Sequence, residues 1–597
     1  MRNMNRGTFL KQTLKAGAFV LIHPLLFTKA SAQSSPYKND LLDRLVTTND
    51  AQVAKLLQTN FDQREFNRRL AYDLVLLIAS YCCTPSKYYQ SAELLVPMQK
   101  LSQHLANAQT PDGTINVGNL ESPPDTAFIV EIVSPGVSVL QKENSTALSG
   151  LKNQLQSFLQ KAGDALVTGG VHTPNHRWVI SAALAKINAL YPHPKYVARI
   201  DEWLDEGIYI NKDGNYPERS RIYSYVENTA FVTIGSLLKR PALFEPVRRN
   251  LDATYYYMEP NGDLITNDSR RQDQYAWIQP DVNTPTNMLN YYLLYRYMAI
   301  KDRNPNYAAI VALVEQMKGF EERVLNRELI HFLEEPLLQQ DLPAPATLPV
   351  QYEKLFAQSQ LLRIRRNEVT TTFFGGTDQP LTIASGRSSS PDFFGFRKGN
   401  ALLQYMRFSA GFFSMGYFYS DGLQKVGDKY VLHQKLQAPY YQPMPKNLRK
   451  GDGDYLLSES TDGRFWNKMD FKQRPVSNVK TLETTISLSE NGGRNLLQFD
   501  VKGQAGVQVT IELCFNEGGQ LTGVSEAGDD NFFLEKGMGQ YAFGGDTIQF
   551  GPGAVSHKSI RNLEGERYST HFGSLRTKGM HVYITGTTPF THQLTFS

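Results

Sequence analysis

The sequence predicts an α+β multidomain protein, with an N-terminal α/α toroid of helical hairpins followed by a C-terminal antiparallel β-sandwich. From about residue 38 to 335, apolar residues recur at helical spacing between short polar breaks. After about residue 360 they alternate with polar residues, and turn residues become frequent. The stretch LPAPATLP, between these regions, is typical of a linker. The predicted organisation is a signal peptide at 1–32, the toroid at 38–335, a linker at 336–359 and the β-sandwich at 360–597.

The first 32 residues have the pattern of a cleaved signal peptide. A basic start precedes an apolar stretch that is shorter than the ~20 apolar residues needed to span a bilayer. Ala30, Ser31 and Ala32 then offer a small-residue cleavage site. We therefore expect a periplasmic or secreted protein with no membrane anchor after cleavage.

The net charge of the chain indicates no particular partner. The full sequence carries a formal charge of +4, but five of its basic residues and none of its acidic residues lie in the signal peptide. The mature chain is therefore close to neutral, at about −1. Attraction for a polyanion would need a local cluster of cations. No basic run with interleaved aromatic residues suggests a nucleic-acid partner.

Cysteine and histidine spacing predicts neither a metal nor a cofactor. The three cysteines, Cys82, Cys83 and Cys514, have no spacing of the C-x-x-C kind. The GDGD stretch at 451–454 is better interpreted as a turn, because no spaced set of oxygen ligands accompanies it. His172 and His176 are four residues apart, but Pro174 lies between them and indicates that only the second is helical.

Five segments of the N-terminal region have the clearest helical patterns: 64–81, 148–166, 196–210, 287–300 and 308–320. Helical hairpins repeated in this way can close into a toroid, in which the ends of the inner helices line a groove. The C-terminal region contains five clear strand-like segments: 362–376, 478–493, 495–503, 507–515 and 581–596. Their alternating pattern predicts antiparallel strands layered as a sandwich.

The stretch from His172 to Thr229 holds the residues best suited to chemistry. In its first half, VHTPNHRWVISAALAKI, apolar residues predict a helix that begins near Asn175 and His176. In its second half, a Gly/Asn/Pro turn precedes another helical pattern that carries Tyr223. The sequence therefore predicts an amide, an imidazole and a phenol at the mouths of two successive helices.

These three groups suit the β-elimination of a uronic acid that is linked through O4. The C5 proton of the sugar is acidic because it lies next to the carboxyl group, and amide and imidazole groups can stabilise the charge that develops there. A tyrosine can take this proton, return one to the leaving oxygen, or do both. Because the ordinary pKa of tyrosine is about 10, a nearby cation is required. Arg219 lies one helical turn before Tyr223 and is the first candidate, with Arg177 and Arg221 as others.

Two motifs in this stretch, NHRW at 175–178 and E-x-S-x-x-Y at 218–223, resemble those of the toroid-fold polysaccharide lyases. This superfamily includes heparinase II/III, alginate lyases and chondroitin AC/hyaluronate lyases. In that group an Asn/His pair neutralises the uronate and a tyrosine transfers the proton. The resemblance implies these roles for Asn175, His176 and Tyr223, and an anionic polysaccharide or oligosaccharide as the substrate.

Further segments extend the resemblance over most of the chain. SPPDTAF at 122–128 and PNGDLITNDSRRQD from Pro260 are similar to substrate-groove segments, and Asn447–Pro475 looks like the central β-domain of chondroitin AC and hyaluronate lyases. Two features depart from the pattern. Ser224 follows the tyrosine where many heparinase-like members have His, and Phe393–Met406 contains no His. A second catalytic histidine is therefore not assigned.

The predicted site has a catalytic part and a substrate-binding part. The predicted catalytic residues are Asn175, His176, Tyr223 and Arg219. The residues expected to bind substrate are Asn119, Asp125, Arg177, Arg221, Tyr225, Arg270, Arg271 and His433.

Two other functions remain open. A toroid glycoside hydrolase acting on uronides would need paired carboxyl groups across a cleft. Asp125, Asp213, Glu218 and Asp268 are the available acids. A non-catalytic glycan-binding protein would use aromatic platforms such as Tyr255–Tyr257, although a packed helix end explains that cluster more simply. A lyase product contains a C4–C5 double bond that absorbs ultraviolet light, a hydrolase product does not, and a binding protein releases nothing.

Overall fold

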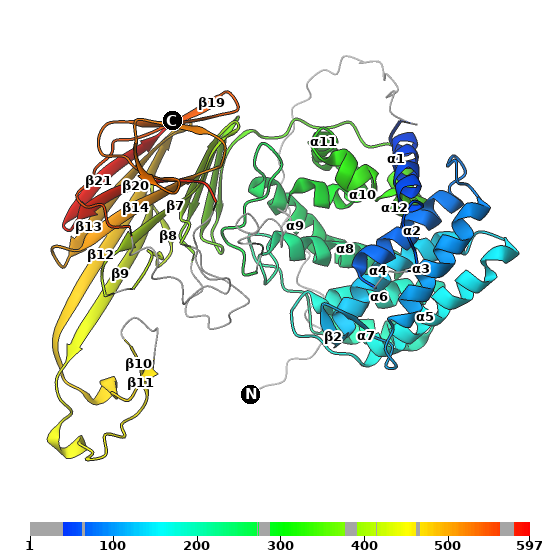
Figure 1. The fold of residues 1–597 in the computed structure, drawn as a ribbon, viewed down its shortest axis with the longest axis horizontal. Coiled ribbons are helices and arrows are strands. Elements are labelled where there is room, and N and C mark those ends of the chain that lie inside the picture. Colours follow the sequence, from blue (N-terminus) through cyan, green and yellow to red (C-terminus); the bar gives the residue numbers. More distant parts are fainter. Residues whose placement is uncertain are drawn as a thin grey trace, which may run out of the picture. The chain divides into compact units, whose positions relative to one another are not determined.

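A computed structural model describes residues 40–62, 66–271, 273, 287–376, 391–413, 415–460, 466–560 and 578–597. It confirms the predicted fold class, because helices fill the first half of the chain and strands fill the second (Figure 1). From Leu42 to Ser597 the chain forms one compact unit. The predicted signal peptide lies outside the described residues.

The helical half consists of long helices joined by short connections. Its α-helices are α1 Asp40–Leu56, α2 Arg68–Cys82, α3 Leu95–Asn107, α4 Pro123–Leu140, α5 Ser149–Thr168, α6 His176–Leu190, α7 Pro194–Asp205, α8 Arg221–Leu237, α9 Phe244–Tyr257, α10 Tyr292–Asp302, α11 Pro305–Val314 and α12 Leu329–Glu334. Short turns of helix are η2 Ala92–Leu94, η3 Thr146–Leu148, η4 Pro241–Leu243, η6 Met288–Tyr291, η7 Glu321–Leu325 and η8 Pro336–Gln339. A small hairpin, β1 Ile115–Val117 and β2 Asn119–Ser122, leads directly into α4.

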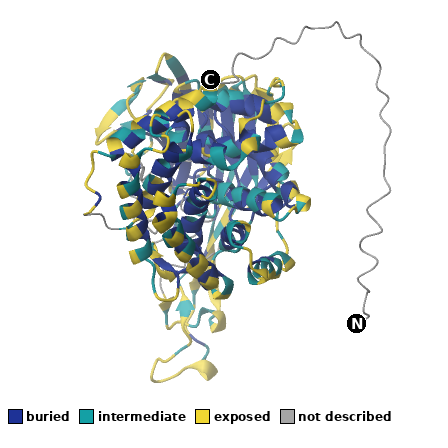
Figure 2. Cartoon of the chain, turned by 90° about the vertical axis from the view of Figure 1, so that its right-hand side faces the viewer, coloured by how far each residue is buried: buried dark blue, intermediate teal, exposed yellow. Residues whose placement is uncertain are grey.

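The helices form an inner and an outer layer. Helices α2, α4, α6 and α8 pack against one another in series, and each also contacts its successor in the outer layer, α3, α5, α7 or α9. Helix α12 returns to contact α2 and α4, so the helical half ends beside its own beginning, as expected for a toroid. Buried residues lie nearly all round α6, whereas in α7 only Tyr196 and Ile200 are buried. Figure 2 shows helices that combine buried and exposed residues in this way at the surface of the helical half. This difference between α6 and α7 is typical of an inner and an outer helix.

Local capping explains where the inner helices begin. The side chain of Asn67 accepts a hydrogen bond from the Leu70 N–H at the start of α2. Ser122 caps α4 in the same way, and two prolines occupy the first helical positions there. Ser220 caps α8 by accepting from the Tyr223 N–H. Such caps satisfy backbone donors that have no partner within the helix, and they place the mouths of α4 and α8 next to predicted site residues.

The β half contains two large sheets. Their strands are β3 Gln351–Phe356, β4 Leu361–Arg366, β5 Val369–Phe374, β6 Phe394–Lys398, β7 Ala401–Ala410, β8 Leu423–Val426, β9 Lys429–Tyr441, β12 Val476–Asn491, β13 Arg494–Gly503, β14 Gln508–Phe515, β15 Gln520–Thr522, β16 Ser525–Gly528, β17 Asn531–Phe533, β18 Gly539–Phe543, β19 Asp546–Gly551, β20 Met580–Thr587 and β21 Phe590–Phe596. A separate pair, β10 Ser458–Glu459 and β11 Trp466–Asn467, lies between β9 and β12.

The two sheets face each other across an apolar core. One has the order β15-β18-β19-β21-β13-β12-β9-β8, and the other has the order β16-β17-β20-β14-β7-β6-β5-β4-β3. Rings from both sheets meet in the core, as when Phe394 of β6 packs 5.2 Å from Phe596 of β21. The described pairs are antiparallel except β17 with β20, which pair in parallel and depart from the predicted antiparallel pattern. The arrangement is a β-sandwich.

The segment 336–359 is more ordered than the predicted linker. It contains η8, and then β3, which pairs with β4 through a register that ends at Phe356 and Leu361. β3, with the sequence QYEKLF, has exposed residues at alternate positions, which is typical of an edge strand. In the sequence alone, such a polar segment resembles a linker. No helix of the described chain is long and apolar enough to cross a membrane.

Glu259 links residues that are far apart in the sequence. It lies just after α9, is buried, forms an ion pair with Arg363 at 2.7 Å, and accepts a hydrogen bond from Arg397 at 3.0 Å. Thr370 donates a further hydrogen bond of 2.5 Å to it. Both guanidinium groups are themselves buried and cannot be solvated by water. The Glu259 carboxylate therefore neutralises their positive charge.

Replacing Glu259 by Ala is expected to destabilise the protein strongly. The substitution leaves Arg363 and Arg397 buried without their carboxylate. Removing one partner of a buried ion pair lowers the free energy of unfolding by about 3–5 kcal/mol. A thermal melt followed by circular dichroism measures the loss. Glu353→Ala is the matched control, because its ion pair with Lys425 is largely exposed and is worth about 0–1 kcal/mol. Equal melting temperatures for the two variants would contradict the expectation.

Candidate active site

Asn175 and His176 open helix α6. Asn175 already has helical dihedral angles, and its carbonyl accepts the first hydrogen bonds of the helix, from Trp178 and Val179. Its side chain is fully buried, whereas His176 is partly accessible. The two residues therefore lie at the N-terminus of an inner helix, where the helix dipole favours an anion.

Glu218 connects Asn175 to the segment that precedes α8. The Asn175 side-chain amide donates to Glu218 Oε1 at 2.7 Å, and the Asn175 backbone N–H donates to the same oxygen at 3.3 Å. The other carboxylate oxygen of Glu218 accepts from Arg271 at 3.1 Å. A single buried carboxylate thus holds an amide on one side and a guanidinium on the other.

Arg271 in turn reaches Tyr223. Its guanidinium carbon lies 4.3 Å from the centre of the Tyr223 ring, within the range of a cation–π interaction. Tyr223 is the third residue of α8 and is partly accessible. Arg219, just before the Ser220 cap, has φ +48°, and this left-handed residue turns the chain into the helix. Asn175, Glu218, Arg271 and Tyr223 therefore form one continuous set of contacts, which we call the Glu218 relay.

His176 lies beside this relay. Burial, together with the nearby His172 and Arg271, lowers the pKa of His176 to about 4, and Asp125 opposes this shift. The rings of His172 and His176 meet edge to face with their centres 4.7 Å apart. Nδ1 of His176 is buried and has no hydrogen-bond partner among the described residues. The imidazole is therefore a neutral group, not a cation, near neutral pH.

This lowered pKa gives a testable pH dependence. Burial favours the uncharged ring, so His176 takes up a proton only when the pH falls to about 4 rather than near its ordinary pKa of 6.5. If the neutral ring is the active form, the acid limb of kcat/KM that belongs to His176 is expected near pH 4. A pH–rate profile of the wild type and of His172→Ala measures it. A limb near pH 6.5 that disappears in His176→Ala would contradict the expectation.

Asn119 and Asp125, from the predicted groove segment, are held together. The Asn119 amide donates to Asp125 Oδ2 at 3.0 Å, and the Ser122 hydroxyl donates to the same oxygen at 2.8 Å. Arg68 forms an ion pair with the other oxygen of Asp125. Asp125 is buried and saturated with donors, so it positions its neighbours, whereas Asn119 is exposed and stays a candidate for substrate contact.

Two predicted residues have partners that change their interpretation. Arg221 is buried at 1% exposure, pairs with Asp268 at 3.0 Å and lies over the Tyr257 ring, so it supports the turn and cannot reach substrate in this structure. Arg177 is paired with Glu206 at 2.7 Å. These contacts correct the prediction for Arg221, because a guanidinium at the first position of α8 points into the core.

Of the remaining predicted residues, Arg270 lies beside the Glu218 relay and His433 lies elsewhere. Arg270, next to Arg271, donates to the Pro217 carbonyl at 2.9 Å and so stays beside the relay. His433, on β9, lies between Asp421 at 3.3 Å and Glu483 at 2.9 Å, and no described contact links it to the relay. The cation over the Tyr223 ring is Arg271, 48 residues away in the sequence, and not the neighbouring Arg219 that the sequence favoured. Helical spacing alone gives no signal for such a contact.

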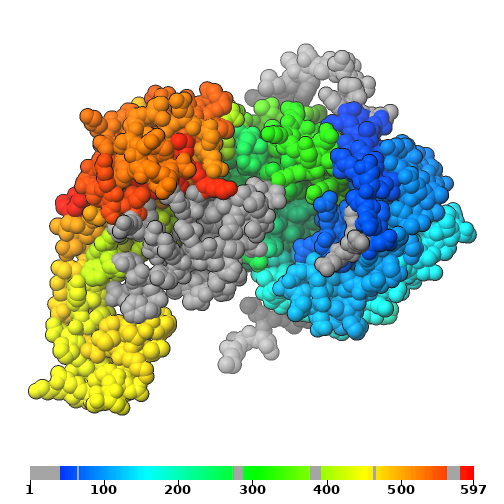
Figure 3. Space-filling model, viewed as in Figure 1, coloured from blue at the N-terminus to red at the C-terminus, as the bar shows by residue number. Residues whose placement is uncertain are grey.

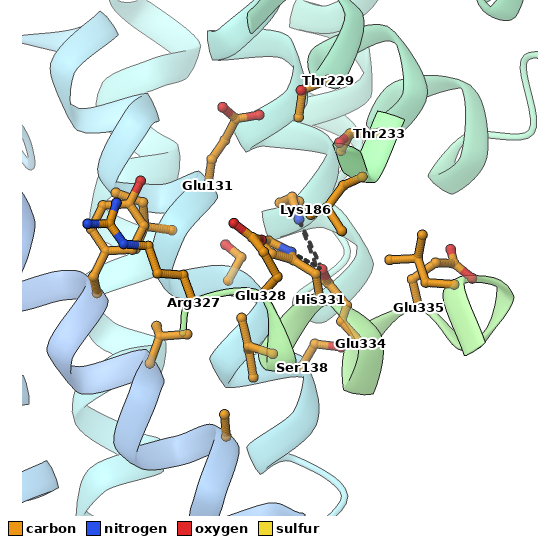
Figure 4. Close-up of a pocket in the computed structure, with 18 of the residues that line it drawn as sticks. Glu131, Ser138, Lys186, Thr229, Thr233, Arg327, Glu328, His331, Glu334 and Glu335 are labelled. Atoms are coloured by element: carbon orange, nitrogen blue, oxygen red, sulfur yellow. Dashed lines mark hydrogen bonds and ion pairs between the residues drawn. The ribbon is translucent and has the colours of Figure 1, made fainter. Parts of the chain in front are cut away.

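Tyr225 lines a cavity in the middle of the inner helices. The cavity has a volume of about 1220 Å³ and is lined by residues of α2, α4, α6, α8 and α12. Figure 4 shows Glu131, Lys186, Glu328, His331 and Glu334 around it. Burial raises the pKa of Glu131 to about 7, whereas Lys186 and His331 outweigh burial and lower the pKa of Glu334 to about 2. Tyr225 thus belongs to this cavity rather than to the relay.

In the described part of the chain, no three His, Cys, Asp or Glu side chains are grouped as metal ligands. The Glu218 relay instead offers a carboxylate, an amide, a guanidinium and a phenol, and His176 beside it adds a neutral imidazole. Apart from Glu218, these groups either donate hydrogen bonds or exchange protons. The arrangement can bind a carboxylate and move a proton next to it.

Comparison with solved structures finds the same fold in known polysaccharide lyases. The chondroitin AC lyase of Streptomyces coelicolor A3, solved with chondroitin sulphate, matches with a TM-score of 0.53 at 13% identity, over 96% of this chain and 80% of that one. Heparinase III matches with a TM-score of 0.51 at 13% identity, over 95% and 85%. A Paenibacillus xanthan lyase matches with a TM-score of 0.53 at 10% identity, over 94% of this chain and 57% of its own.

These likenesses define the class of fold. A search of protein-family models and a search of curated protein sequences each find no match. The chain has the helical toroid and β-sandwich of the toroid polysaccharide lyases, as its short motifs predicted. At this level of identity the likeness establishes the fold, and the chemistry has to be argued from the residues of the site.

Proposed function

We propose that this protein is a polysaccharide lyase that cleaves a uronic-acid-containing glycan by β-elimination. The single observation that carries the proposal is the Glu218 relay, which brings Asn175, Arg271 and Tyr223 together with His176 beside them. The likeness to the lyase fold supports the proposal independently of these contacts.

The proposed reaction transfers one proton from C5 to O4 and does not consume water. The phenolate of Tyr223 takes the C5 proton, the electrons of the C5–H bond form the C4–C5 double bond, and the C4–O4 bond breaks. The O4 oxygen leaves with the proton that the phenol has gained, so Tyr223 returns to its starting state. Arg271 lies over the ring and stabilises the negative charge on the phenolate, because the interaction between a guanidinium and an aromatic face strengthens with the charge on the ring.

The carboxylate of the sugar is proposed to lie between His176 and Arg271. A neutral imidazole can donate one hydrogen bond, and the N-terminal end of α6 adds the favourable helix dipole. Asn175 has a different place from the one the motif implied. It is buried and gives its amide to Glu218, so it acts as a positioning residue for Glu218 and, through it, for Arg271.

A panel of uronic-acid polysaccharides tests the proposal. Glucuronan, alginate and glycosaminoglycans are each incubated with the protein, and ultraviolet absorbance is followed. A rise in absorbance that accompanies chain shortening is the expected result, since elimination leaves a double bond conjugated to the carboxyl group. Chain shortening with new reducing ends but no absorbance would reject the lyase.

The central cavity favours a hydrolase as the second candidate. The four acids considered from the sequence are all engaged, as with Asp213, which accepts from the backbone N–H groups of Gln358 and Ser359. Glu131 is different, because one of its oxygens is buried without a partner among the described residues and its pKa is raised to about 7. Such a carboxyl can serve as a general acid. Hydrolysis that is lost in Glu131→Gln and kept in Tyr223→Phe would favour this function over the lyase.

The place of action is also part of the proposal. The N-terminal pattern supports export to the periplasm or the medium, where polymeric substrates are found. N-terminal sequencing of the protein recovered outside the cytoplasm is expected to begin at Gln33. An intact N-terminus in a cytoplasmic fraction would contradict this.

A further inference from the structure

A ribbon of two strands extends from the β-sandwich beyond its neighbours. β9 pairs with β8 only through residues 429–432, and β12 pairs with β13 only from Leu482 onward. Between these limits β9 and β12 pair with each other and continue into the segment that carries β10 and β11 (Figure 1). We call the described residues of this ribbon, 437–460 and 466–480, the arm.

Many contacts hold the end of the arm in one shape. The β10–β11 pair places Glu459 opposite Trp466, and the Asp470 N–H donates to the Leu456 carbonyl at 3.1 Å. Arg449 and Arg474 each donate to a carbonyl within the arm, at 2.8 and 2.6 Å. The rings of Tyr441 and Phe471 stack with centres 4.3 Å apart. The described part of the arm is therefore a built structure with fixed side-chain positions.

The arm exposes an unusual share of large hydrophobic side chains. Eight of the nineteen that are exposed in the described chain belong to it: Tyr440, Leu448, Leu456, Leu457, Trp466, Met469, Val476 and Val479. Trp466 is 60% exposed and Tyr440 is 51% exposed. Figure 3 shows the arm in yellow, without cover from other described elements in that view. Patches of this kind mark surfaces that bind something.

Cations accompany these rings. Among its described residues the arm has seven Lys and Arg but only four Asp and Glu, although the mature chain as a whole is close to neutral. Lys446, Arg449, Lys472 and Arg474 take part in no ion pair between described residues. Arg474 also lies over the Tyr455 ring at 5.6 Å. Rings and cations that no described carboxylate neutralises, on one projecting element, suit a ligand that is both anionic and able to stack.

We infer that the arm is a second binding site for the anionic polysaccharide, separate from the Glu218 relay. Sugar rings along the chain pack their apolar faces on Trp466 and on Tyr440, and their carboxylate or sulfate groups pair with the lysines and arginines. The ligand class rests on the proposed function. The site holds a long chain to the enzyme and does not itself cut it.

The edges of the arm disfavour another copy of this chain as the occupant. Pro439 removes a backbone donor from β9, and β12 has an irregular register between Val476 and Asn478. Lys480 adds a charge beside these positions. Such features blunt strand edges against pairing with another sheet. The side chains on the faces stay available, and they are the part that a polysaccharide would use.

Affinity electrophoresis in gels that contain alginate, glucuronan or a glycosaminoglycan tests the inference without turnover. The full-length proteins compared are the wild type, Trp466→Ala, and the double variant Lys446→Glu with Lys472→Glu. Matched controls are Tyr209→Ala, which removes a ring that is also 60% exposed, and Lys536→Glu, which reverses an exposed charge outside the arm. The retarding polymer is expected to bind about fivefold more weakly to each arm variant, and both controls are expected to match the wild type.

Kinetic measurements separate this inference from the proposed function. On the polymer, KM is expected to rise about fivefold in the arm variants, with kcat unchanged. On a short oligosaccharide both constants are expected to stay the same. Equal retardation of all proteins would overturn the inference while leaving lyase activity intact. A dimer in sedimentation that Trp466→Ala dissociates, without any change in retardation, would overturn it in favour of a second copy. Arm-dependent retardation without ultraviolet-absorbing product from any polymer would support the site and reject the lyase.

Discussion

Tyr223→Phe is expected to abolish turnover, with kcat falling about 10³-fold or more. The substitution removes one oxygen atom and leaves the ring, which Arg271 contacts and which the start of α8 positions. Only the group that exchanges the proton is lost. Substrate binding and the thermal melt are therefore expected to stay close to the wild type, and ultraviolet absorbance at saturating polymer measures kcat.

Tyr225→Phe is the matched control for this prediction. It removes the same atom two residues further along α8, from a ring that lines the central cavity rather than the relay. Its activity on polymer is expected to match the wild type. If Tyr223→Phe kept normal kcat, Tyr223 would have no part in proton transfer. If Tyr225→Phe lost activity instead, the reaction would have to be placed in the cavity.

The fold was largely predictable because its signals are local. Helical and alternating spacing of apolar residues persist over long segments, and the caps at Ser122 and Ser220 lie next to the residues whose backbone they satisfy. The edge strand β3 was the exception. Its exposed, polar alternation looks like a linker, and only pairing with β4 makes it a strand. The sequence of one segment does not reveal which strand it pairs with.

The site was predictable only in part, for the same reason. Asn175, His176 and Tyr223 follow short motifs, so their positions at helix mouths could be predicted from the sequence. The contact between Arg271 and Tyr223 joins a loop to a helix, and the sequence offered the nearer Arg219 instead. Arg221 looked like a surface cation, but it is buried against Asp268. A charged residue with a buried partner elsewhere in the chain cannot be told from an exposed one by spacing.

The structure also changes the way in which Asn175 is understood. A motif assigns a role to a residue type, whereas the contacts show what the side chain is doing. The amide of Asn175 holds Glu218, whose other oxygen holds Arg271. A residue at the mouth of α6 therefore determines where a cation lies relative to a ring on α8. Loss of Asn175 should reach the reaction through Arg271.

Arg271→Met is expected to lower kcat about 10²- to 10³-fold, because it removes the cation that stabilises charge on the phenolate and near the sugar carboxylate. Methionine keeps much of the apolar length of the side chain, so the Tyr223 ring retains a packing partner. Glu218 loses its ion pair at 3.1 Å, and the thermal melt shows how much of the effect is structural. The measurement is kcat and KM on polymer by ultraviolet absorbance.

Arg270→Met is the matched control, since it changes the adjacent residue in the same way. Arg270 donates to the Pro217 carbonyl and is expected to affect kcat far less than Arg271. Asn175→Ala should fall between them, because it leaves Arg271 in place but frees Glu218 to move. A raised KM with unchanged kcat in Arg271→Met would make Arg271 a simple binding residue. The phenolate would then need a different cation, and the Glu218 relay would not be the catalytic arrangement.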